Sequence, residues 1–398
     1  MLLLLACVSD PDIPMRGEEP DEPGTPHLGA VELIEGERWF SAEVIHQIDI
    51  ELPAPSLLGL ATDPYSYVEG AVTIGDRRLS PVGVRLRGKY GSFRTLDGKP
   101  KFKIDLNRYD PSLSYAGLEQ LALNNEVVDC SHQREPLGYA VFAALDLPAP
   151  RTAYTRVSVN GEHYGLYVIV EFPDDVFLGD HYDDGSGNLY DGKYLYEWPS
   201  GDYALVDFTS ELVGNFVLEE GEDVGGADVG AVAEAAEAGG LVAENLAAVV
   251  DMERFHRHIV AEELIGHVDG YALNTNNYRV YFDPDDGLAD LLTYDLDYAF
   301  YEDSSWGMSW SRPRGILARR CWQDPGCVSR HAEVVAEALD QLDSEAFIEQ
   351  LDAWTALIAD DLEDDPRNEC RPRSVGANQR ELKEWMEETE ERVRDHWR

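Results

Sequence analysis

The stretch that decides the fold of this chain runs from residue 267 to residue 297. It opens with a polar loop that reads His267-Val268-Asp269-Gly270-Tyr271-Ala272-Leu273-Asn274-Thr275-Asn276-Asn277. An apolar helical pattern precedes the loop and starts after Asp251, a residue type that caps helices well. Two short predicted strands, 278–282 and 291–294, follow, and the second runs directly into Asp295-Leu296-Asp297. A helix and loop therefore deliver one Asp with a nearby Asn, and a hairpin delivers a second acidic cluster.

This order of parts is the one that protein kinases use for phosphoryl transfer. The spacing from Asp269 to Asn274 matches the catalytic loop, so Asp269 is our candidate for the catalytic base. Because Mg²⁺ prefers carboxylate and amide oxygens, we assign Asp295 and Asp297 as metal ligands, together with an Asn. No DFG sequence follows, and no Arg stands beside Asp269. The sequence therefore predicts an atypical kinase.

A lysine on a β-strand is expected to hold the phosphates. Residues 101–106, Lys-Phe-Lys-Ile-Asp-Leu, alternate strictly, which places Lys101 and Lys103 on one face of a strand. We prefer Lys103, which lies deeper in the run, and keep Lys101 as the alternative. Glu135, near the start of a helix predicted over 131–145 with Ser131 as its N-cap, is the candidate partner of that lysine, or simply an early-helix acid.

Two further segments are candidates for nucleotide contacts. Arg87, followed by Gly88, Gly91 and Ser92, can approach phosphates, although a plain β-turn explains the glycines as well. Glu171 ends a predicted strand where a kinase hinge would offer backbone groups to adenine. That strand forms a hairpin with residues 152–159 through Asn160-Gly161.

Several of these motifs together resemble the spore-coat protein H (CotH) kinase-like family. The matching elements are Arg85-Leu86-Arg87-Gly88, Lys101-Phe102-Lys103-Ile104, Leu121-Ala122-Leu123-Asn124-Asn125, Arg134-Glu135, Asn160-Gly161-Glu162-His163-Tyr164-Gly165-Leu166-Tyr167, Gly187-Asn188-Leu189-Tyr190, the 269–278 loop and Tyr294-Asp295-Leu296-Asp297.

The resemblance implies a divergent kinase fold that uses ATP with Mg²⁺ (or Mn²⁺) to phosphorylate Ser or Thr of secreted or surface proteins. It favours Asn277, just before Tyr278, as the metal-binding amide, so Asn274 and Asn277 both stay candidates. Two departures stand out: Asp191 replaces a frequent Lys, and Tyr294 replaces a usual Trp.

The pattern along the chain indicates an α+β fold with two lobes, a divergent (atypical) protein-kinase-like bilobal fold. We expect a β-rich N-lobe over 33–171 and a mostly helical C-lobe over 172–398 that carries the catalytic loop and the metal site.

Composition excludes some functions. The 398 residues include 77 Asp and Glu but only 32 Lys and Arg, a formal charge of −45. Such a chain should repel nucleic acid, which needs a basic surface. Hydrophobic residues make up 44%, enough for a real core.

The N-terminus points to export. Residues 1–7 end in Leu4-Leu5-Ala6-Cys7, which resembles a truncated lipoprotein signal with Cys7 as the lipidated residue. Residues 8–32 are acidic and Pro-rich, as in a flexible tether. We therefore expect an extracytoplasmic bacterial lipoprotein on the cell envelope, and no later segment predicts a transmembrane helix.

The other four cysteines fit disulfides in an exported chain. We expect Cys321–Cys327 first, because a Pro-Gly turn lies between them, and then Cys130–Cys370; four reduced thiols are the alternative. No Cys-x-x-Cys spacing indicates zinc, and the histidines form no metal-like grouping in the sequence.

Two other functions use the same residues. One is a surface or coat scaffold that keeps the fold without catalysis. The other is a metal-dependent phosphohydrolase, which would release phosphate without an acceptor protein. The retention of Asp269 and of the Asp295–Asp297 pair favours the kinase.

Overall fold

The computed structural model describes residues 39–40, 44–240 and 242–397. The predicted lipoprotein signal with Cys7, over residues 1–7, and the predicted tether, over 8–32, lie outside the described residues. Among the helices of the described part, none is both long enough and apolar enough to cross a bilayer.

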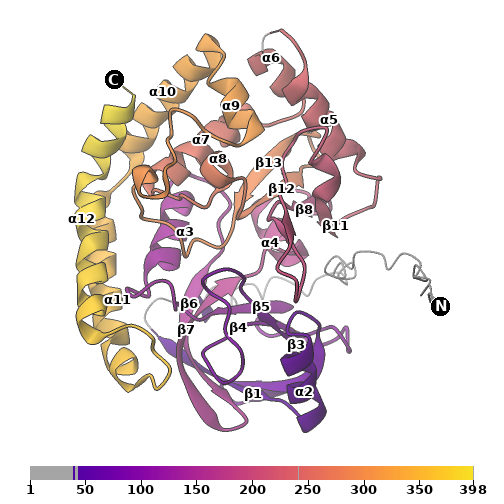
Figure 1. Ribbon diagram of the computed structural model, residues 1–398, viewed down its shortest axis with the longest axis vertical. Helices are drawn as coiled ribbons and strands as arrows, with labels where there is room; N and C mark the ends of the chain where they lie inside the picture. The colour runs from indigo at the N-terminus through magenta and orange to yellow at the C-terminus, as the bar shows by residue number, and fades with distance from the viewer. Residues whose placement is uncertain (1–38, 41–43, 241, 398) are drawn as a thin grey trace, which may run out of the picture.

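A closed seven-stranded barrel forms the first part of the described chain, at the bottom of Figure 1. Its strand order is β1-β2-β3-β4-β5-β7-β6, with antiparallel neighbours except for the parallel pair of β1 and β6, which closes it. Buried apolar side chains such as Ile48, Val84 and Phe102 fill its core. The strands are β1 (Ile45–Glu51), β2 (Val68–Ile74), β3 (Arg77–Arg87), β4 (Lys101–Asp105), β5 (Gln120–Asn124), β6 (Thr152–Val159) and β7 (Glu162–Glu171).

The β6–β7 hairpin turns at the predicted Asn-Gly pair. Asn160 and Gly161 have φ values of 50° and 81°, the left-handed conformations that a tight hairpin turn requires. The Asn160 side chain also holds the turn against the end of β1, since it bonds both the N–H and the carbonyl of Leu52. This hairpin is confirmed as predicted.

Helix α3 (Arg134–Ala144) connects β5 to β6 and packs outside the barrel core, in a cluster shared with residues of α7 (Met252–Leu264), β6 and β7. Its start differs from the predicted capping by Ser131. The carboxylate of Asp129 accepts hydrogen bonds from the backbone N–H groups of Ser131, Gln133 and Arg134, so Asp129 organises the turn that leads into the helix. The prediction considered Ser131 as a cap and did not consider that the side chain of Asp129 can bind the same backbone N–H groups.

The remaining chain is mostly helical around a four-stranded sheet of order β11-β8-β12-β13. Asp251 caps α7 as predicted, since its carboxylate accepts from the N–H groups of Glu253 and Arg254. The strands are β8 (Asn188–Asp191), β11 (Val217–Glu220), β12 (Tyr278–Phe282) and β13 (Ala289–Thr293), with β9 (Leu195–Tyr196) and β10 (Tyr203–Ala204) paired separately. The helices are α2 (Ala54–Thr62), α4 (Asp175–His181), α5 (Ala227–Glu237), α6 (Val242–Leu246), α7 (Met252–Leu264), α8 (Tyr271–Asn274), α9 (Ile316–Cys321), α10 (Pro325–Gln341), α11 (Ser344–Asp364) and α12 (Pro372–His396), with 3₁₀ turns η1 (Val213–Asn215) and η2 (Asp303–Trp306).

The last two helices tie the barrel to the helical part. α11 and α12 run side by side down one flank of the molecule in Figure 1, and α11 packs on β7. Between them, the carboxylate of Asp365 pairs with Lys99 at 2.6 Å, and both side chains are fully buried. Disulfides join Cys130 to Cys370 and Cys321 to Cys327, as predicted. The Lys99–Asp365 pair and the Cys130–Cys370 disulfide thus each tie the C-terminal part of the chain to residues near the barrel strands.

Candidate active site

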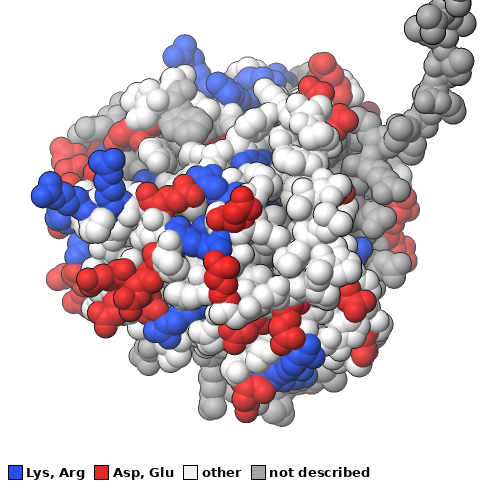
Figure 2. Space-filling view, turned by 60° about the horizontal axis from the view of Figure 1, so that its bottom comes forward, with Lys and Arg blue, Asp and Glu red and all other residues white. Residues whose placement is uncertain are grey.

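A pocket lies where the end of β3 and the following loop meet the 191–194 segment, the 269–278 loop and the end of β13. Its lining is unusually rich in basic residues for this chain: five basic and five acidic side chains line it, against 32 and 77 in the whole sequence. Figure 2 shows the barrel end of the molecule, where Lys and Arg also lie interspersed with acidic groups. The charged residues of the lining are Arg85, Arg87, Lys89, Lys193, Arg279, Asp191, Glu219, Asp269, Asp295 and Asp297.

At one end of the pocket, Lys101 bridges the two predicted metal ligands. Its Nζ lies 3.0 Å from Asp295 Oδ1 and 2.8 Å from Asp297 Oδ2, and the Lys101 side chain is buried. Lys103, which we preferred from the sequence, lies instead over the ring of Phe172, 3.7 Å from its centroid. The alternating pattern placed both lysines on one face, and the tertiary structure brings Lys101 to the acidic pair.

The charges of this trio are strongly coupled. Burial opposes the charge on Lys101, but Asp295 and Asp297 raise its pKa well above the usual range. Burial also acts against Asp295, yet Lys101 and Arg87 hold its pKa below the usual value. Burial and the neighbouring Asp295 raise the pKa of Asp297 to about 8. Two carboxylates that contact the same ammonium repel each other, and the charge of Lys101 offsets that repulsion.

Asp269 is held by three asparagine amides. Its Oδ1 accepts from Asn274 at 2.6 Å, and its Oδ2 accepts from Asn276 at 3.2 Å and from Asn277 at 3.0 Å. The loop that carries these residues is fixed in turn by Glu262 of α7, whose carboxylate accepts from the backbone N–H groups that start α8. The Asp269 carboxylate is therefore oriented before any substrate arrives.

Burial raises the pKa of Asp269 to about 6, against the opposing effect of the asparagine hydrogen bonds. Near neutral pH the group is mostly ionised but close to its pKa, which is the condition that favours a general base. His267, two residues before it, is fully buried, and burial lowers its pKa to about 4, so this imidazole is neutral.

Asn277 connects the two acidic sites. Its Nδ2 donates to Asp269 and, at 3.0 Å, to the backbone carbonyl of Asp295. Both Asn277 and Asp295 have positive φ, 49° and 54°, a conformation that costs energy for residues other than glycine and gathers at functional sites. Asn274 also donates to Asp269, but its Oδ1 accepts from Arg314. The structure thus brings Asn277, and not Asn274, to the Asp295–Asp297 pair.

The other predicted residues lie at varied distances from the pocket. Arg87 lines it and donates to Asn124 at 3.1 Å and to the hydroxyl of Tyr294 at 2.5 Å. Glu135 is buried nearby and accepts from Asn124 at 2.5 Å, while the ion pairs of Lys101 go to the aspartates. Glu171 turns its side chain to Arg151, so only the following Phe172 lines the pocket.

Sequence reasoning missed several residues of this site. Asn276 lies in the loop already singled out, and the run of amides was the available signal. The family pattern has a Lys at position 191, where this chain has Asp191. Lys193 lies two residues later, and its ammonium pairs with the Asp191 carboxylate. Lys89 enters from the β3–β4 loop and donates to the carbonyl of Tyr194 at 3.0 Å. Loops of mixed Gly, Asp and Tyr gave no periodic signal for these two lysines.

The residues present suit a divalent cation. Asp295 and Asp297 offer hard carboxylate oxygens at one place, and Lys101 shows that this place favours positive charge. Asn277 adjoins them through its Nδ2, while its Oδ1 accepts from Asn276. Arg87, Lys89 and Lys193 add cations suited to phosphate on the same pocket wall.

Comparison with known proteins gives the family. Residues 84–394 match the model of the family described as CotH kinase protein, so this chain belongs to the CotH kinase family, as its motifs indicated. No curated protein matches the chain.

Solved structures give weaker likenesses. The proinflammatory kinase CtkA of Helicobacter pylori aligns with 10% identity and a TM-score of 0.36, covering 78% of this chain and 93% of that one. The Golgi casein kinase with Mn/ADP bound aligns with 9% identity and a TM-score of 0.30, covering 90% of this chain and 76% of that one.

Proposed function

We propose that this protein is an atypical protein kinase with a divergent, bilobal kinase-like fold, which transfers the γ-phosphoryl group of ATP to Ser or Thr of a secreted or surface protein. The observation that carries the proposal is the constellation at one pocket: Asp269 fixed by three amides, beside an acidic pair that is bridged by a strand lysine. Membership of the CotH kinase family supports it.

Asp269 is the catalytic base in this proposal. Its carboxylate accepts the proton of the acceptor hydroxyl as that oxygen bonds to the γ-phosphorus. The bond from the γ-phosphorus to the β–γ bridging oxygen breaks, and ADP leaves. The three asparagines keep the carboxylate oriented, which removes the cost of reorganising it during the reaction.

Asp295, Asp297 and Asn277 are the residues that would hold Mg²⁺ or Mn²⁺. The ion supplies neutralisation of phosphate charge when bound. Arg87, Lys89 and Lys193 bind phosphate oxygens, and Phe172, which follows the end of β7, contacts the nucleotide base. Lys101 positions the acidic pair, and Glu135 contributes negative charge that raises the pKa of Lys101.

We further propose that the protein works outside the cytoplasm as a bacterial lipoprotein, anchored through Cys7 on a tether over 8–32. The sequence of the N-terminus supports this, and two disulfides fit an oxidising compartment.

The test is a phosphotransfer assay on the full chain with labelled ATP and Mg²⁺ or Mn²⁺, beside Asp269→Asn and Asp295→Ala variants. We expect labelled protein or Ser/Thr peptides with the wild type and at least about 10²-fold slower labelling with either variant. Free phosphate without labelled acceptor would establish the hydrolase instead. A folded protein with neither activity, and with no rise in Tm on adding nucleotide and metal, would instead support a non-catalytic scaffold function.

A further inference from the structure

A second cluster of metal-ligating side chains, none of which lines the pocket, lies among α7, α9 and α10. His256 of α7, Cys321 at the end of α9 and Cys327 in the first turn of α10 each place one ligand atom within 4.8 Å of the others, and all three are buried. The Nε2 of His256 lies 3.9 Å from the Sγ of Cys327. Sequence spacing hid this group, because the histidine comes from a helix 65 positions before Cys321.

His331 of α10 sets the orientation of the His256 ring. The two Nδ1 atoms are 3.2 Å apart, so one ring donates its N–H to the lone pair of the other. When His256 is the donor, its Nε2 carries a lone pair aimed at the cysteines. His331 then carries its proton on Nε2. This nitrogen is fully buried and has no hydrogen-bond acceptor, and the ring contacts Trp322 and Trp397. An N–H facing indole rings is a satisfactory environment, whereas a buried lone pair there is not.

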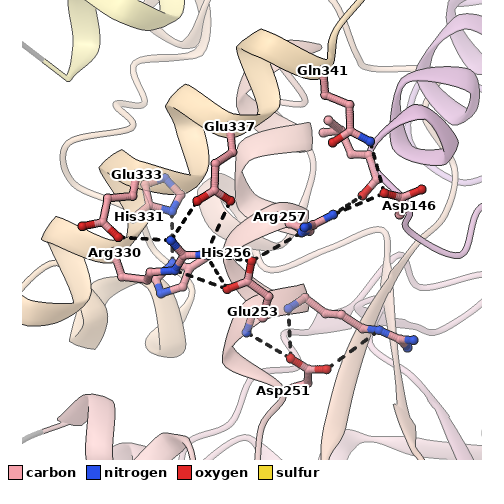
Figure 3. Close-up of polar contacts among 12 residues, drawn as sticks. Asp146, Asp251, Glu253, His256, Arg257, Arg330, His331, Glu333, Glu337 and Gln341 are labelled. Atoms are coloured by element: carbon pink, nitrogen blue, oxygen red, sulfur yellow. Dashed lines mark hydrogen bonds and ion pairs between the residues drawn. The ribbon is translucent and has the colours of Figure 1, made fainter.

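The helices that carry these ligands are fixed to one another. Arg330 of α10 pairs with Glu253 of α7 at 2.9 Å and with Glu337 at 3.0 Å, and Figure 3 shows this network beside His256 and His331. The carboxylate of Asp324 caps α10 by accepting from the N–H groups of Gly326 and Cys327. The contact between Arg330 and Glu253 therefore joins α10 to α7, the helices that carry Cys327 and His256.

We propose that this locus has two states: the Cys321–Cys327 disulfide, and, after reduction, a Zn²⁺ site formed by both Sγ atoms and His256 Nε2. His331 is the positioning residue that fixes the tautomer of His256. A thiol or phosphine reductant takes the disulfide to two thiols and is itself oxidised, and binding of Zn²⁺ then releases the two thiol protons.

The geometry suits zinc. Tetrahedral Zn²⁺ with Zn–S bonds of about 2.3 Å separates two sulfurs by about 3.8 Å, and the Cα atoms of the pair are 5.3 Å apart. Thiolate and imidazole are the ligands that zinc takes in proteins, and three protein ligands leave one position for water.

The test uses the full chain carrying Cys130→Ser and Cys370→Ser. Of the two disulfides in the part of the chain that the structure describes, only Cys321–Cys327 then remains. This chain is incubated with Zn²⁺ before and after reduction with a phosphine, and the bound metal is counted by native mass spectrometry. We expect one Zn²⁺ per reduced chain and none in the oxidised chain at the same locus. Co²⁺ in place of Zn²⁺ should give a thiolate-to-cobalt charge-transfer band, and the fluorescence of the adjacent tryptophans should change.

Two variants make the result specific. Adding Cys321→Ser and Cys327→Ser should abolish binding, and His331→Phe should weaken it about 10- to 100-fold while keeping all three ligands. Circular dichroism reports whether each chain is folded. A reduced chain that folds only with Zn²⁺ also supports the site. A reduced chain that binds no Zn²⁺, or that binds it equally without the two thiols, overturns the proposal.

Discussion

Lys101 of β4 donates to Asp297 across 196 residues of sequence, with 2.8 Å between Nζ and Oδ2. The same ammonium lies 3.0 Å from Asp295, so a single buried cation joins the barrel to both acidic residues of the candidate metal site. This relationship makes the charge of Lys101 part of the site itself, and the first prediction tests it.

Replacing Lys101 by Met should abolish phosphotransfer and make folding depend on metal. The change leaves the buried Asp297 and the partly exposed Asp295 without their ammonium partner, at a cost of about 3–5 kcal/mol in the free energy of unfolding. Mg²⁺ should recover part of that loss, so the rise in Tm on adding Mg²⁺ should be larger for the variant than for the wild type. Lys103→Met is the matched control, because Lys103 lies on Phe172 and should leave the Mg²⁺ effect unchanged. Equal Mg²⁺ effects in all three proteins would contradict this account.

Activity should fall as the pH drops through about 6. The reason is the raised pKa of Asp269: above it the carboxylate can accept a proton, and below it the group is already protonated. The measurement is kcat/KM against pH at saturating Mg²⁺. Asp269→Asn should lower the rate about 10²- to 10⁴-fold and remove the acidic limb. An unchanged limb in that variant would assign the titration to another group.

Variants of the two candidate asparagines, Asn274 and Asn277, should differ in how their activity depends on the Mg²⁺ concentration. Asn277 touches both Asp269 and the carbonyl of Asp295, so Asn277→Ala should raise the Mg²⁺ concentration for half-maximal activity by about tenfold or more. Asn274 contacts Asp269 and Arg314, so Asn274→Ala should lower kcat without moving the Mg²⁺ dependence. The reverse pattern would show that Asn274, and not Asn277, acts at the metal site.

The buried Lys99–Asp365 pair should matter more to stability than an exposed pair of similar length. Lys99→Met leaves Asp365 charged and buried, and we expect it to cost about 3–5 kcal/mol. Adding Asp365→Asn to that variant should recover part of the loss, since the buried charge is then gone. Arg78→Ala, which breaks the half-exposed pair with Glu51, should leave Tm almost unchanged. Urea unfolding followed by circular dichroism decides between these outcomes.

The two disulfides should contribute unequally. Cys130–Cys370 spans 240 residues and Cys321–Cys327 spans 6. On the chain-entropy argument, they stabilise the fold by about 5 and about 2 kcal/mol. Double serine variants at each pair, unfolded in urea without reductant, measure the difference. A larger loss at the short pair would show that packing around it, not loop closure, governs its effect.

Local sequence patterns were sufficient for much of the architecture. Asn160-Gly161 specified the β6–β7 turn because few residues adopt two successive positive φ values, and Asp251 specified the start of α7 through its side-chain cap. The prediction of Ser131 as the N-cap was wrong, because the helix begins at Arg134. Ser131 Oγ accepts from the N–H of Gln133, but Asp129 binds that N–H and the N–H of Arg134. Local rules work where the interacting atoms are close in sequence.

The sequence by itself determined the family, through motifs such as Tyr294-Asp295-Leu296-Asp297, and the residue types that its chemistry needs. Only the tertiary structure decided that Lys101 and not Lys103 meets the acidic pair, that Asn277 and not Asn274 reaches Asp295, and that His256 faces two cysteines. The strand period of two places Lys101 and Lys103 on the same face of β4. It does not show which of the two lies opposite the acidic pair. Which side chains meet depends on the closure of the barrel and on how α7 packs on α10, and these long-range contacts leave no local signal in the sequence.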